Sequence, residues 1–90
     1  MDKVYVVMGS CGSYEDRYEW TVCAYPNQRE ADKHRAAAQH RATVIYEASK
    51  IGRKRIGINE WDAEMCLDFG GAYYKVVEVH YRETMKEIMG

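Results

Sequence analysis

Proline is almost missing from this chain of 90 residues: Pro26 is the only one. Ser/Gln-rich tracts are missing too, and 47 % apolar with 30 % charged residues is an ordinary globular composition. These features exclude a chain that is largely disordered or of low complexity. The length suits one domain and leaves nothing for a second, so we predict a single domain over residues 1–90.

Long hydrophobic runs are also absent. No apolar stretch approaches the about 20 residues of a membrane span, and the start, Met1-Asp2-Lys3-Val4, enters a strand pattern without an apolar signal region. The three cysteines are an odd number at scattered spacing, which favours reduced thiols over a disulfide framework. We therefore expect a cytoplasmic protein without a membrane partner.

Metal-ligand spacing is the third absence. The side chains that could ligate zinc show neither Cys-x-x-Cys nor His-x-x-x-His spacing; they are Cys11, Cys23, Cys66, His34, His40 and His80. His34 and His40 are six residues apart and so do not share a helix face. We predict no metal and no cofactor.

Two β-branched runs, at about 3–8 and 19–25, alternate with the period of strands. In the second run, Trp20, Val22 and Ala24 are expected to share a face. Between the runs lie about ten polar residues, from Gly9 to Tyr18, where a hairpin needs only two to five. Long loops on rigid strands concentrate binding residues, so this loop is where we expect the protein to act.

A helix is predicted over residues 28–50, with Asn27 as its N-cap and Glu30 three positions later. Its small residues fall on one stripe at helical spacing, which lets the helix lie close to a sheet; the stripe is Ala31, Arg35, Ala38, Ala42, Ile45 and Ala48. Such a helix is about 35 Å long, whereas a six-residue strand is about 20 Å. One end should therefore overhang the sheet, unless the helix is broken.

Residues 65–69 read as a third strand and residues 73–82 as a fourth, joined at Gly70-Gly71. Two registers of this hairpin, one residue apart, remain open. The fourth strand is apolar on both faces, so we expect the helix on one face and loops or a second subunit on the other. The fold class predicted is α+β, in ββαββ order, with a four-stranded antiparallel sheet packed on one long helix. A homodimer is expected.

The partner-binding residues predicted in the loop combine aromatic rings, carboxylates and an arginine; they are Tyr14, Glu15, Asp16, Arg17 and Tyr18. Tyr and Arg are common in binding hot spots because they offer large contact area and directed hydrogen bonds. The alternative is local: Asp16 or Glu15 pairs with Arg17, and Tyr18 and Trp20 pack into the core.

A basic stretch offers a phosphate or nucleic-acid contact; its residues are Lys50, Arg53, Lys54 and Arg55. The sequence pI of about 6.3 lacks the usual nucleic-acid footprint, and cations at a helix C-terminus are favoured by the helix dipole alone. Cys11, in the segment Gly9-Ser10-Cys11-Gly12, is the one candidate nucleophile. Alternatively, the two glycines of this segment could form an anion-binding turn. The sequence has neither a phosphate-loop lysine nor a motif that supplies a base, so we predict that the protein is not an enzyme.

The opening Lys3-Val4-Tyr5-Val6-Val7-Met8-Gly9, followed by Gly12-x-Tyr14-x-Asp16-Arg17-x-Glu19-Trp20, resembles a family of small uncharacterised tailed-bacteriophage and prophage accessory proteins. Many members carry proline after the Glu-Trp pair, where this chain has Thr21. The resemblance implies a small protein that acts by stoichiometric binding to a host bacterial protein or defence complex, as an anti-CRISPR inhibitor does. The alternative is a nucleic-acid or nucleotide-binding module that uses residues 50–55.

Overall fold

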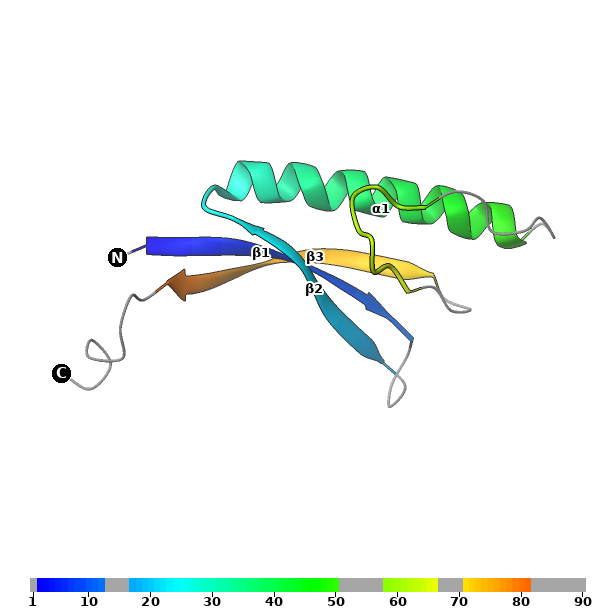
Figure 1. Cartoon of the computed structure of the whole chain (residues 1–90), viewed down its shortest axis with the longest axis horizontal. Helices are drawn as coiled ribbons and strands as arrows, with labels where there is room; N and C mark the ends of the chain where they lie inside the picture. Colours follow the sequence, from blue (N-terminus) through cyan, green and yellow to red (C-terminus); the bar gives the residue numbers. More distant parts are fainter. Residues whose placement is uncertain (1, 13–16, 51–57, 67–70, 82–90) are drawn as a thin grey trace.

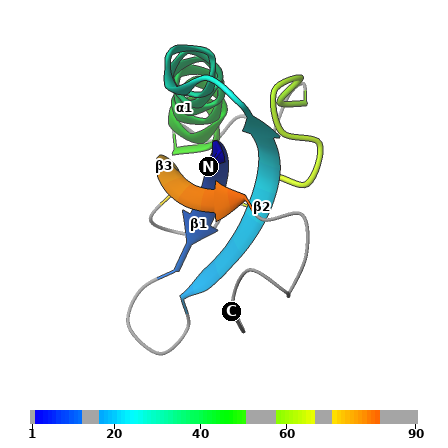
Figure 2. The same ribbon diagram turned by 90° about the vertical axis from the view of Figure 1, so that its left-hand side faces the viewer.

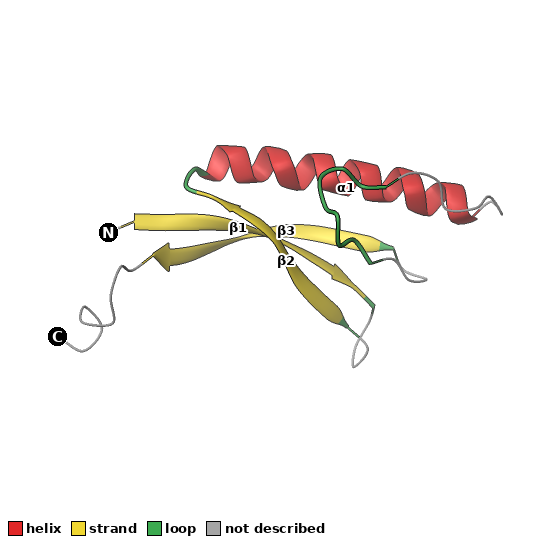
Figure 3. Ribbon diagram, viewed as in Figure 1, coloured by secondary structure: helices red, strands yellow, loops and turns green. Residues whose placement is uncertain are grey.

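The computed structural model describes residues 2–12, 17–50, 58–66 and 71–81. These contain three strands and a helix, in the order β1 (Asp2–Cys11), β2 (Tyr18–Tyr25), α1 (Gln28–Lys50) and β3 (Ala72–Tyr81). The helix lies across one face of the sheet, which makes a two-layer α+β domain (Figures 1 and 3).

The strands form one sheet in the order β2-β1-β3, with both outer strands antiparallel to β1. The two outer strands are therefore parallel to each other, and α1 lies on the crossover between them. The predicted ββαββ order and four-stranded sheet are wrong. Met65 and Cys66, expected to begin a third strand, lie outside any strand, and residues 67–69 fall outside the described residues.

The partner of β3 explains this correction. β3 pairs with β1 over ten residues, from Cys11↔Ala72 to Asp2↔Tyr81. The two registers predicted for the hairpin at Gly70-Gly71 depend on residues 67–70, which lie outside the described residues. A central strand needs apolar residues on both faces, and β1 supplies them by alternation: Val7 faces the helix while Val6 faces away. The long β1 is therefore the strand that pairs with β3 in the described sheet.

The first hairpin is longer than the sequence indicated, and its loop is shorter. Cys11 pairs with Tyr18, so both belong to the ladder, and residues 12–17 alone connect the strands. A bulge in β2 opposite Val7 and Met8 also shifts the alternation, so that residues of β2 before and after it lie on opposite faces where strict alternation predicts the same face. As a result Trp20 lies on the helix face and Ala24 on the opposite face, contrary to the expectation that they share one.

The helix begins and ends where the sequence predicts. The Asn27 side-chain oxygen accepts hydrogen bonds from the backbone N–H of Arg29 (2.8 Å) and of Glu30 (3.3 Å), as an N-cap does. The predicted stripe is largely confirmed as the packing surface, with four residues buried: Ala31, Ala38, Ala42 and Ile45. The helix is continuous, and its C-terminal end extends beyond the strands, as expected from its length (Figure 1).

The two faces of the sheet differ sharply, because α1 covers only one of them (Figure 2). Under the helix lies a core of mostly small residues; its largest fully buried side chains among the described residues are Ile45 and Val7. We call the opposite side the outer sheet face. Its residues on β3 are partly exposed: Tyr73, Val77, Val79 and Tyr81.

Candidate functional site

The carboxylate of Asp62, which is only 4 % exposed, forms a buried polar centre. One oxygen, Oδ2, accepts hydrogen bonds from the Trp20 indole N–H (2.8 Å) and the Tyr74 hydroxyl (2.7 Å). The other, Oδ1, accepts one from the backbone N–H of Glu64 (3.1 Å). A charge this buried needs such donors, so Asp62 ties the segment of residues 58–66 to both β2 and β3.

Asn59 anchors the start of the same segment to the helix. Its side-chain amide donates to the backbone carbonyl of Ala38 (3.0 Å), and its side-chain oxygen accepts from the N–H of Trp61 (3.0 Å). Sequence reasoning missed both Asn59 and Asp62. The available signal was a short polar stretch ahead of an apolar run, which reads equally well as a solvated linker.

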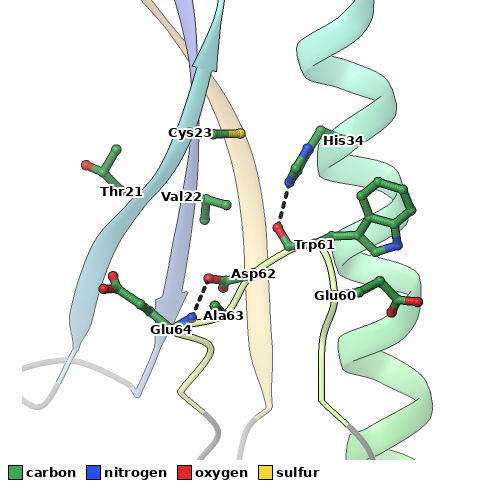
Figure 4. Close-up of a pocket in the computed structure, with 9 residues that line it drawn as sticks. All are labelled: Thr21, Val22, Cys23, His34, Glu60, Trp61, Asp62, Ala63 and Glu64. Atoms are coloured by element: carbon green, nitrogen blue, oxygen red, sulfur yellow. Dashed lines mark hydrogen bonds between the residues drawn. The ribbon is translucent and has the colours of Figure 1, made fainter.

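A pocket of about 490 Å³ lies between β2, α1 and the 58–66 segment (Figure 4). Its lining combines apolar strand residues with polar side chains from the other two elements: Thr21, Val22, Cys23, His34, Glu60, Trp61, Asp62, Ala63 and Glu64. The pocket thus gathers a thiol, an imidazole and three carboxylates, which raises the question of whether they form a reactive group.

Both ring nitrogens of His34 take part in hydrogen bonds. Nε2 lies 2.6 Å from the carbonyl oxygen of Trp61, which can only accept, so Nε2 carries a proton. Nδ1 shares a hydrogen bond with the Tyr25 hydroxyl at 2.8 Å. Burial, and next the charge of Asp62, raise the pKa of the Cys23 thiol, which keeps it protonated. Both nitrogens of the imidazole are therefore engaged in hydrogen bonds within the fold.

Only two of the five predicted partner-binding residues are described. Arg17 pairs with Glu19 (2.9 Å), which also binds Lys75 (3.4 Å). Tyr18 is 56 % exposed, and its ring stacks on Trp20 with centroids 5.6 Å apart. Tyr14, Glu15 and Asp16 lie outside the described residues.

The basic stretch is likewise described only at its start. Lys50 is the last residue of α1, and Arg53, Lys54 and Arg55 lie outside the described residues. Cys11, the candidate nucleophile, is buried at the end of β1. The described residues contain no cluster of His, Cys, Asp or Glu that could hold a metal ion.

The outer sheet face carries the largest set of exposed apolar side chains on one surface. Val77 lies opposite Val6, and Val79 lies opposite Val4, so two rows of valine run along β1 and β3. Tyr73 and Tyr81 stand at the two ends of the β3 row. Lys75 lies on the same face between Tyr73 and Val77, opposite Met8, and pairs there with Glu19. A charged side chain therefore separates Tyr73 from the valine rows.

Comparison with known protein families, curated proteins and solved structures found no match to this chain. Within the described ranges, no helix is both long enough and apolar enough to span a membrane.

Proposed function

We propose that this protein acts by stoichiometric binding to another protein, without turnover, through the outer sheet face. The observation that carries the proposal is the outer row of β3, where Val77, Val79 and Tyr81 are 37, 40 and 50 % exposed and Tyr73, on the far side of Lys75, is 60 % exposed. Contiguous exposed apolar surface on a protein marks interaction sites. Tyrosine at both ends adds contact area together with a hydrogen-bonding group.

The core under the helix supports the same proposal. Its buried residues are mainly alanine and other small side chains, so the contact between helix and sheet removes little apolar area per residue from water. Covering the outer face would add the burial that a small domain needs. The partner surface that fits is apolar in its centre, with polar groups at the end that meets Lys75 and Glu19.

The hairpin end provides the rim of this surface. Glu19 and Tyr73 both lie opposite Ser10, so the side chains near the predicted loop adjoin the outer face. Arg17 reaches the same place through its ion pair with Glu19. Of the described residues named from the sequence, Arg17 is thus proposed as a peripheral contact, while the valine rows form the centre.

A host bacterial protein is the partner proposed, on the basis of the resemblance to phage accessory proteins. A second copy of the chain is proposed to cover the face when that partner is absent. Three strands of about ten residues span roughly 33 Å by 14 Å, or about 460 Å² on each copy. Two such faces give about 900 Å², below the about 1,000 Å² expected of a stable interface, so this dimer should dissociate readily.

The test compares Val77→Asp on the outer face with Val44→Asp on the exposed side of α1, where Val44 is 44 % exposed. Tagged wild type and both variants are incubated with bacterial lysate, and retained proteins are quantified against bait. We expect a near-equimolar partner with wild type and Val44→Asp, and at least a 10-fold loss with Val77→Asp. Far-UV circular dichroism checks folding, and Tyr81→Asp, at the end of the strand, replaces Val77→Asp if that variant unfolds.

Sedimentation of the same proteins tests the second copy. Wild type should show a monomer–dimer equilibrium at micromolar concentrations, and Val77→Asp should remain a monomer. A partner that Val77→Asp retains in full would overturn the proposed surface. A monomeric wild type would overturn only the dimer.

A further inference from the structure

Cys11 and Cys66 are 55 residues apart in the sequence, yet their sulfur atoms are 3.0 Å apart. Cys11 is buried at the end of β1, and Cys66 is partly exposed at the end of the 58–66 segment. A covalent sulfur–sulfur bond is about 2.05 Å long, so the two atoms need to approach by only about 1 Å to be joined.

Each cysteine is positioned by contacts that do not involve the other. Cys11 is the last residue of the central strand, where it pairs with Tyr18 on one side and Ala72 on the other. Cys66 follows Met65, whose backbone N–H donates to the carbonyl of Asp62 (3.2 Å), while the Asp62 side chain is held by Trp20 and Tyr74. The short sulfur–sulfur distance therefore follows from the docking of the whole segment on the sheet.

We propose that Cys11 and Cys66 are a redox-active pair that forms an intramolecular disulfide on exposure to a peroxide. The more accessible thiol, Cys66, attacks the peroxide oxygen as a thiolate; the O–O bond breaks, a sulfenic acid forms and one water leaves. The Cys11 sulfur then attacks the Cys66 sulfur, and the hydroxyl leaves as a second water. Two thiols are oxidised to one disulfide, while one hydrogen peroxide is reduced to two waters.

The third cysteine provides an internal control. Cys23 lies on β2, opposite Val7, where burial and then the charge of Asp62 raise its pKa. A thiol that stays protonated reacts slowly with peroxide. Oxidation should therefore select one pair out of the three that are combinatorially available.

The disulfide would tie the 58–66 segment covalently to the sheet. It encloses α1 and most of the chain between its ends, and cross-links that close long loops restrict the unfolded state most. The same segment carries Asp62 and lines the pocket beside β2. Peroxide should thus raise the stability of the fold and lock this side of the pocket.

The full-length protein is treated with hydrogen peroxide at a small molar excess and then alkylated with iodoacetamide. Its intact mass should show the loss of two hydrogens and one alkylated thiol, against three alkylated thiols in the reduced protein. Peptide mapping should join the peptides of Cys11 and Cys66. The melting temperature should rise on oxidation and return to its starting value with dithiothreitol.

Two single variants decide the assignment. Cys23→Ser should form the same bridge and show the same rise in melting temperature. Cys66→Ser, at a partly exposed position, should keep its fold and show neither. A bridge to Cys23, a purely intermolecular disulfide or oxidation of Cys66 beyond sulfenic acid without a bridge would each overturn the proposal.

Discussion

The indole of Trp20 lies against Gly9, its direct neighbour across the β1–β2 ladder. A Cβ atom on Gly9 would lie 2.5 Å from two carbon atoms of the ring, so the position has no room for a side chain. The space lets the indole reach Asp62 and meet the Tyr74 ring edge-on, with centroids 6.3 Å apart. A glycine in the middle of a strand therefore creates the site on which the polar centre is built.

Gly9→Ala should destabilise the fold, since the added methyl group forces the indole off its site. We expect a loss of about 1–3 kcal/mol in the free energy of unfolding, the usual effect of overpacking, measured by urea denaturation. Ser10→Ala, the adjacent residue on the outer face, is the control and should change the stability by less than about 0.5 kcal/mol. Equal stability of wild type and Gly9→Ala would show that the indole shifts at no cost.

Asp62→Ala should be among the most destabilising single substitutions in the chain. It leaves the Trp20 N–H and the Tyr74 hydroxyl buried without their acceptor, and each such donor costs about 1–3 kcal/mol. We expect a total loss of about 3 kcal/mol or more in denaturant titrations. Asp32→Ala, on the exposed side of α1, is the matched control. A similar small effect of both variants would contradict the role of Asp62.

The stability should fall at alkaline pH because of Tyr74. Burial, then its hydrogen bond to Asp62 and the charge of that carboxylate, raise the pKa of Tyr74 well above the ordinary value of 10.0. Above about pH 10 the unfolded chain loses the phenolic proton while the folded chain keeps it, so the contribution present at lower pH is lost as pH rises.

Tyr74→Phe removes this contribution. Its free energy of unfolding should therefore decline less steeply above pH 10 than that of the wild type, by up to about 1.4 kcal/mol per pH unit. Urea titrations at several pH values between 9 and 11 measure the two slopes. Identical slopes would mean that the phenol ionises equally in both states.

Arg17→Ala should affect partner binding more than folding. The ion pair of Arg17 with Glu19 is exposed, and exposed pairs contribute about 1 kcal/mol or less to stability. We expect an unchanged melting temperature within about 2 °C and weaker retention of the partner in the lysate experiment. A large drop in melting temperature with intact binding would make Arg17 a structural residue instead.

The local elements could be predicted from the sequence because their signals are local. The Asn27 cap and the alanine stripe define a helix whose bounds match α1, and alternation defines the strands within a few residues. The fourth predicted strand corresponds to β3, with Tyr74 on the helix face and Val77 on the opposite face, as its alternation indicated.

Pairing could not be predicted in the same way. Alternation shows which residues share a face, but it does not show which strand is the neighbour. β3 pairs with β1, although β2 and the whole of α1 separate the two strands in the sequence. The bulge opposite Val7 and Met8 reverses the face of the rest of β2 without any glycine or proline to mark it. These outcomes depend on contacts between residues far apart in the chain.

The candidate sites follow the same division. The sequence by itself determined the helix, three of the four strand-forming runs predicted and an apolar row on the last strand. Only the tertiary structure decided that Asp62 meets Trp20 and Tyr74, that Cys11 meets Cys66, and that the apolar row lies on the face opposite α1. The physical reason is that helix and strand periodicity is set within a few residues, whereas a buried carboxylate or a thiol pair needs groups brought together by the packing of the whole chain.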